Sequence, residues 1–191
     1  MSLRKYFLKS NFTYKIYLIY NLFIRHKIFL RKKSYSQFAE DLEIINFFKN
    51  KKKGKYLDIG CFHPVMYSNT HLLYQKGWSG INIDLNQTTI DLFKIARPKD
   101  INLCRVIGGE KKMVKVHFDS LFSPVNTAEE KFYNEYKKEF FKNEFIREVM
   151  SQKLTDIFNE NNISKIDFVN IDAEGMDYKI LQQFDFGKIK V

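Results

Sequence analysis

The sequence predicts an α/β domain with a mainly parallel sheet and flanking helices. Short apolar runs alternate along the chain with segments of helical periodicity, as they do in doubly wound sheets. Three of the four main runs end in an aspartate, at Asp58, Asp84 and Asp172. Ligands bind such sheets beyond the carboxyl ends of the strands. These three carboxylates therefore mark the expected site.

The elements follow one another from residue 34 onward. A helix over about 37–49 has Ser34 and Ser36 as candidate N-caps. The expected core strands cover 55–60, 80–84, 102–107 and 166–171, and residues 113–118 alternate weakly as an edge strand. The remaining helices are expected after the capping residues 68–70 and over 86–96, 153–161 and 176–184.

Residues 119–150 interrupt this alternation. They are rich in Phe, Glu and Lys, and residues 128–150 have helical character. We expect a helical insertion over the site, in the position of a lid.

The positive charge is concentrated in the N-terminal part of the chain. The net charge is +10, whereas residues 1–55 alone carry +11 and the first acidic residue is Glu40. An enzyme acting on nucleic acid would spread Lys and Arg over the face that tracks the backbone. The distribution therefore argues against a nucleic-acid partner. The two cysteines form neither a disulfide framework nor a zinc pattern, so a cytoplasmic location is expected.

Residues 1–33 form a basic amphipathic arm ahead of the predicted domain at 34–191. Its longest uncharged stretch, 16–24, would span ~14 Å as a helix, against a hydrocarbon core of ~30 Å. Two interpretations stay open. The arm packs its apolar face on the domain, or it lies on the anionic inner face of a membrane as a peripheral anchor. Aromatic residues at three-residue spacing fit both, namely Tyr14, Tyr17, Tyr20 and Phe23.

The turn after the first strand is unsuited to a dinucleotide. It holds one glycine, Gly60, and not the G-x-G-x-x-G pattern that a pyrophosphate requires. The carboxylate of Asp58 would also repel a pyrophosphate. It suits a cationic ligand, such as the aminoacyl end of S-adenosylmethionine. Asp84, at the tip of the second strand, can accept hydrogen bonds from ribose hydroxyls.

These segments resemble the FkbM-type methyltransferases. The matching pieces, in family order, are residues 36–41, 56–64, 68–70, 77–84, Arg97 with 100–103, and 166–175. The Gly77-Trp78 segment and the segment Asp172-Ala173-Glu174-Gly175 are the most specific of them.

The resemblance implies a Rossmann-like methyltransferase fold. It implies methyl transfer from S-adenosylmethionine to oxygen, with a hydroxyl of a sugar, surface glycan or related metabolite as the acceptor. The cofactor contacts that it implies are Asp58, Gly60, Asn69, Thr70, Asp84, Ile107, Gly108 and Asp172.

Methyl transfer to a hydroxyl requires removal of its proton by a base. The candidates are His63, Asp172 and Glu174. His63 titrates near neutrality, which suits the role, although it is also explained as a turn residue. Glu174 is alternatively a helix cap. No ligand spacing demands a metal.

The domain is expected to be incomplete at its C-terminus. The resemblance implies about seven strands, whereas four core strands precede residues 189–191, which look like the start of a fifth. The strand at 166–171 would then present an open edge, to be covered by a partner chain or a second copy. The alternative function is a catalytically incompetent methyltransferase remnant that at most binds the cofactor.

Overall fold

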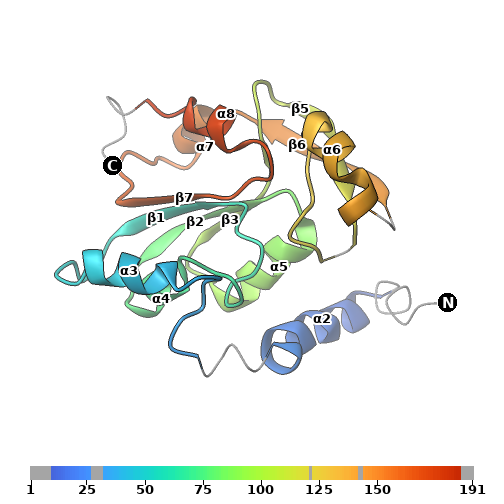
Figure 1. The fold of residues 1–191 in the computed structure, drawn as a ribbon. Helices are drawn as coiled ribbons and strands as arrows, with labels where there is room; N and C mark the ends of the chain where they lie inside the picture. The colour runs from blue at the N-terminus through green and yellow to red at the C-terminus, as the bar shows by residue number, and fades with distance from the viewer. Residues whose placement is uncertain (1–9, 27–31, 121, 142–143, 186–191) are drawn as a thin grey trace.

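The structure is a computed structural model that describes residues 10–26, 32–120, 122–141 and 144–185. A four-stranded parallel sheet lies at the centre of the molecule (Figure 1). The strand order is β3-β2-β1-β7. All neighbouring strands pair in parallel. The strands are β1 (Lys55–Ile59), β2 (Ser79–Asp84), β3 (Ile101–Cys104) and β7 (Phe168–Ile171). The α/β fold with a mainly parallel sheet is therefore confirmed.

Helices cover both faces of this sheet (Figure 1). One face carries α3 (Glu40–Phe47), α4 (His71–Gln75) and α5 (Gln87–Ala96), and the other carries α7 (Leu154–Glu160) and α8 (Asp177–Leu181). Successive strand residues point to opposite faces. Tyr56 of β1 accordingly packs with the α3 and α4 side, whereas Leu57 packs with the α7 and α8 side.

A second, three-stranded sheet adjoins the first. It has the order β4-β6-β5, with β4 (Val106–Ile107), β5 (Lys112–Phe118) and β6 (Phe145–Gln152). The predicted strand 102–107 is thus wrong as one strand, because the chain changes sheets at Arg105. The prediction of helix across 128–150 is also wrong in part. Helix α6 covers only Glu130–Phe140, and β6 follows it.

The strand β6 forms because β5 lies antiparallel to it along seven paired positions. Val149 of β6 packs with Val116 and Phe118 of β5 in a small apolar cluster. This packing between segments decides in favour of a strand, since strand preference depends strongly on neighbouring side chains.

The helix predicted over 37–49 begins later than expected, at Glu40. Its N-cap is Ala39, with a left-handed φ of 68°, so the prediction of Ser34 or Ser36 as the cap is wrong. Both serine hydroxyls instead donate hydrogen bonds to the buried carboxylate of Asp41, at 2.7 and 2.8 Å. A buried carboxylate requires such donors. The Ser36 hydroxyl also accepts a 3.2 Å hydrogen bond from the amide of Asp41, in the first turn of α3.

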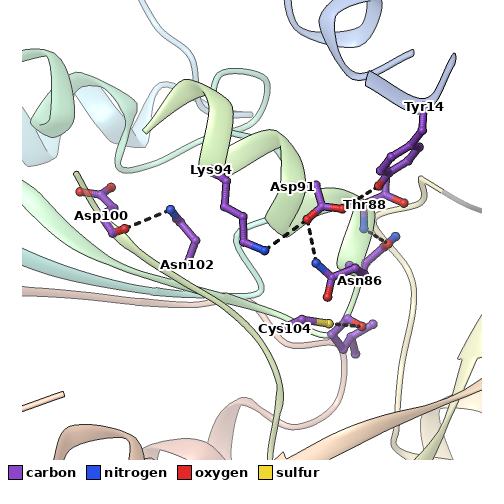
Figure 2. Close-up of polar contacts among 10 residues, drawn as sticks. Tyr14, Asn86, Thr88, Asp91, Lys94, Asp100, Asn102 and Cys104 are labelled. Carbon is purple, nitrogen blue, oxygen red and sulfur yellow. Dashed lines mark hydrogen bonds and ion pairs between the residues drawn. The ribbon is translucent and has the colours of Figure 1, made fainter. Parts of the chain in front are cut away.

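The arm contains α2 (Asn11–Tyr20), which continues into a π-helical turn (Asn21–Arg25). Leu18 and Leu22 are buried against the domain, in a cluster with Phe122. The Tyr14 hydroxyl donates a 2.9 Å hydrogen bond to Asp91 of α5 (Figure 2). Packing of the arm on the domain is therefore confirmed. Across the described ranges, no helix is long and apolar enough to span a bilayer.

The strand β7 lies at an edge of the four-stranded sheet, within the part of the chain that the structure describes. A partner covering this edge stays a prediction. The strand expected to start at 189–191 lies outside the described residues.

Candidate active site

Two cavities meet at the carboxyl ends of β1 and β7. One is mainly apolar, and the residues particular to it include Asp84, Leu85, Val106, Ile107 and Ala173. The other is polar, and the residues particular to it include Glu40, Asp58, Tyr67, Asn69 and Asn170. The residues that line both are Gly60, Phe62, Pro124, Asp172 and Glu174. Two ligand groups could thus meet at one point, the loop ends around Gly60.

The carboxylate of Asp84 is fixed by backbone amides at the end of β2. The amide of Asn86 donates to Oδ1 at 2.7 Å, and the amide of Phe62 donates to Oδ2 at 3.0 Å. Burial raises the pKa of Asp84 to about 6, although both amides act to lower it. Each oxygen retains acceptor capacity toward the apolar cavity, because a carboxylate oxygen accepts two hydrogen bonds.

Asp58, the penultimate residue of β1, is almost completely buried and is held by two side chains. The Thr70 hydroxyl donates to Oδ2 at 2.6 Å, and the Asn170 amide donates to Oδ1 at 2.9 Å. Burial raises the pKa of Asp58, while Thr70 and the charge of Arg97 oppose this. The carboxylate lies at the floor of the polar cavity, where it can compensate a cationic group of a ligand.

The cofactor contacts implied for Asn69 and Thr70 separate in the structure. Asn69 lines the polar cavity and donates a 3.0 Å hydrogen bond to Asn170. Thr70 is fully buried behind Asp58, and its hydroxyl accepts a 2.8 Å hydrogen bond from Arg97. This location gives Thr70 the role of support for Asp58 rather than contact with a ligand.

Gly60 is required by a close approach of the backbone. Its φ is +77°, and a Cβ at this position would lie 1.8 Å from the carbonyl oxygen of Asp172. Only glycine accepts both conditions without strain. The turn therefore brings the end of β7 directly against the end of β1, which places Asp172 and Glu174 at the junction.

Asp172 and Glu174 form the acidic side of that junction. Desolvation and the neighbouring carboxylates of Asp172 and Asp177 raise the pKa of Glu174 to about 7. Desolvation, together with the charges of Asp177, Asp58 and Glu40, also raises the pKa of Asp172. A carboxylate with a pKa near neutrality is well suited to accept a proton and to release it again.

His63 does not support the role of base that its residue type suggested. It is fully buried, and its Nδ1 accepts hydrogen bonds from the amides of Val65 and Met66, at 3.0 and 2.9 Å. The basic lone pair is thus occupied, and burial lowers the pKa of His63 to about 3. Its contacts are those of a structural turn residue.

Of the two predicted contacts Ile107 and Gly108, only Ile107 lies in one of the two cavities. Ile107 lines the apolar cavity, as expected for a residue beside an adenine. Gly108 instead packs against Ser151 and donates a 3.0 Å hydrogen bond to the carbonyl of Gln152, so it extends the pairing of β4 with β6.

Two supporting residues lie in segments that resemble the family but were not predicted as site residues. Asn170 bridges Asp58 and Asn69, and it is a polar side chain inside the apolar strand β7. Arg97 is buried and donates to the carbonyl of Pro64, at 2.6 Å, and to the hydroxyl of Ser68, at 2.9 Å. It therefore holds the loop that carries Asn69.

A comparison with models of protein families matches residues 58–191 to the methyltransferase FkbM domain. This chain belongs to the FkbM methyltransferase family. The matched residues include every candidate contact and base, whereas α2 and α3 lie ahead of them. Neither the curated proteins nor the solved structures that were compared contain a match.

An FkbM methyltransferase must bind a methyl donor beside an acceptor. The two cavities lie next to each other and share a wall at Gly60, Asp172 and Glu174. Among the described residues, no group of three or more His, Cys, Asp or Glu side chains is arranged to hold a metal ion.

Segment 123–128 of the predicted insertion takes part in the site. Residues of this segment line both cavities, and the Thr127 hydroxyl donates a 3.0 Å hydrogen bond to the carbonyl of Glu174. The segment therefore covers the junction, and its movement as a lid stays a prediction.

Proposed function

We propose that this FkbM methyltransferase transfers a methyl group from S-adenosylmethionine to a hydroxyl oxygen, and that it acts in the cytoplasm. The acceptor class that we propose is a sugar, surface glycan or related metabolite. The observation that carries the proposal is the meeting of an apolar and a polar cavity at Gly60, Asp172 and Glu174.

The apolar cavity fits the nucleoside part of the cofactor. Leu85, Val106 and Ile107 offer apolar surface for an adenine ring. Asp84 offers two fixed oxygens for the ribose hydroxyls, since the amides of Phe62 and Asn86 hold its carboxylate. These are the two interactions that a nucleoside requires of a strand end in this type of sheet.

The shared wall fits the charged part of the cofactor. S-adenosylmethionine supplies an electrophilic methyl group on a positively charged sulfur. The carboxylate of Asp172 on the shared wall, and that of Asp58 in the adjoining polar cavity, lie where they can compensate a cation.

The proton of the acceptor hydroxyl passes, in this proposal, to the carboxylate of Glu174. Its pKa of about 7 leaves a large fraction of the group ionised at neutral pH. Its position on both cavities allows it to contact an oxygen in the polar cavity while the donor occupies the apolar one. The chain's own contribution is therefore alignment of two ligands and removal of one proton.

The test is isothermal titration of the full chain with S-adenosylhomocysteine, the demethylated form of the donor. We expect one site per chain, and at least ~10-fold weaker binding by Asp84→Asn, because hydrogen bonds to a charged acceptor are lost. The control is Glu160→Gln, which removes an exposed carboxylate that is paired with Lys111 away from both cavities.

Absence of binding by the wild type would refute the proposal. Binding without transfer to any hydroxyl acceptor would instead support the alternative, a remnant that only holds the cofactor.

A further inference from the structure

The arm helix exposes an apolar stripe on the side that faces away from the domain. The side chains of the stripe are Phe12, Ile16, Ile19, Tyr20, Phe23 and Ile24, and each is between 43% and 74% exposed. They recur at intervals of three and four residues, so they share one helix face. A surface helix normally places polar residues on its outer face, and a contiguous apolar patch marks an interaction site.

We propose that this stripe binds the surface of an anionic lipid bilayer, with α2 and the π-helical turn lying in the plane of the headgroups. The proposal does not depend on the chemistry proposed for the cavities.

The charge of the arm favours an anionic surface. Nine Lys and Arg residues and no acidic residue occur before Glu40. Two of them, Lys15 and Arg25, are exposed on the helix itself. Basic residues beside an apolar helix face contact anionic headgroups while the apolar side chains enter the boundary of the acyl chains. The long stems of Lys and Arg also allow their charges to reach the headgroups from the flanks of such a helix.

The inner face of the same helix is already engaged. Leu18 and Leu22 are buried against the domain, and Tyr14 is hydrogen-bonded to Asp91. Figure 2 shows Tyr14 reaching from the arm to α5. The stripe therefore stays outward while the helix is docked, and binding to a bilayer would need no release of the arm.

The docked arm lies beside the candidate active site. Phe122, which packs with Leu18 and Leu22, stacks on Phe62 with ring centroids 4.7 Å apart. Phe62 lines both cavities. A bilayer that holds the stripe would thus fix the orientation of the cavities relative to the lipid surface.

The experiment is flotation of the full chain with two kinds of vesicle, one of phosphatidylcholine alone and one that also contains phosphatidylglycerol. We expect the wild type to float with the anionic vesicles, and less so as NaCl screens the charges. Ile16→Ser combined with Phe23→Ser should reduce its partition at least ~10-fold, because two side chains that enter the bilayer are lost. Lys15→Gln combined with Arg25→Gln should reduce it ~10-fold on the anionic vesicles alone.

The matched control is Phe47→Ser combined with Ile146→Ser, which removes two exposed apolar side chains outside the arm. It should float as the wild type does, and circular dichroism should show that all variants fold. Sedimentation velocity tests whether the stripe instead binds a second copy of the chain. The proposal is overturned if the wild type does not bind anionic vesicles, or if the Ile16→Ser, Phe23→Ser variant floats equally well. It is also overturned if the stripe forms a dimer and binds no vesicles.

Discussion

The hydroxyl of Thr70 donates a 2.6 Å hydrogen bond to Oδ2 of Asp58, and both side chains are almost fully buried. The same hydroxyl accepts a hydrogen bond from Arg97. It thereby joins a buried anion to a buried cation at the start of α4. The position of Asp58 beneath the polar cavity thus depends on residues that make no contact with a ligand.

Replacement of Thr70 by valine should destabilise the protein. Valine keeps the shape of threonine but leaves Asp58 and Arg97 each without one buried partner, which costs about 1–3 kcal/mol per unsatisfied group. Urea unfolding measures the loss. Thr70→Ser keeps the hydroxyl, so its free energy of unfolding should fall clearly less than that of the valine variant. Equal decreases in the two variants would show that the methyl group, and not the hydrogen bond, is responsible.

Replacement of Gly60 by alanine should abolish the close contact of β1 with the end of β7. The new Cβ would overlap the carbonyl of Asp172, and the φ of +77° is unfavourable for alanine. We expect a loss above ~2 kcal/mol in the free energy of unfolding, since strain and overlap add. Gly109→Ala is the matched control, because a Cβ there meets no atom within 4 Å. A comparable loss in both variants would contradict this account.

Replacement of Glu174 by glutamine should remove the base while it keeps the carboxylates of Asp58, Asp84 and Asp172, which we assign to the donor. General-base catalysis contributes about 10²- to 10⁴-fold in rate, so kcat should fall at least ~100-fold. The wild-type rate should rise with pH through about 7, as Glu174 loses its proton, and the variant should lose this rise. A pH–rate profile with a methylated-product assay measures both. An unchanged rise in the variant would assign the titration to another group.

Replacement of His63 by asparagine should make the protein less sensitive to acid. The folded protein holds His63 neutral, with a pKa of about 3, whereas the unfolded chain binds a proton near pH 6.5. The stability contributed by this group is therefore complete above pH 6.5 and is lost as the pH falls toward about 3.

Asparagine can still accept a hydrogen bond from the amides of Val65 and Met66, but it does not titrate. The difference in the free energy of unfolding between pH 7.5 and pH 4.5 should be about 2 kcal/mol smaller in the variant. Urea unfolding at both pH values measures this difference. An identical pH dependence in the two proteins would show that His63 is not the responsible group.

The parallel sheet was predictable because each core strand is a short apolar run with turn residues at its ends. β1, β2 and β7 lie within a few residues of their expected positions. The strand β6 was not predictable from its own residues, since its partner β5 is brought to it by tertiary packing. The division of residues 102–107 between two sheets likewise follows from a change of partner at Arg105.

The candidate site was predictable in its strand-end residues and not in its supports. Asp84 and Asp172 stand where the strands end, so the sequence places them directly. Thr70 could not be distinguished from a ligand contact, because its role depends on Arg97, 27 residues away. The role of His63 was not predictable either. Its residue type suggests a base, whereas burial lowers its pKa to about 3 and so makes it a poor proton acceptor.

The pairing of Asp58 with Asn170 joins positions 112 residues apart in the chain. During synthesis, β1 therefore leaves the ribosome long before the strand that completes its second side. Contacts of such sequence separation form slowly, because the intervening chain must first be ordered. Until then, the apolar strand β1 has an unpaired edge that can meet other nascent chains. The candidate site thus depends on a late pairing, and the chain is most prone to aggregation in the period before that pairing forms.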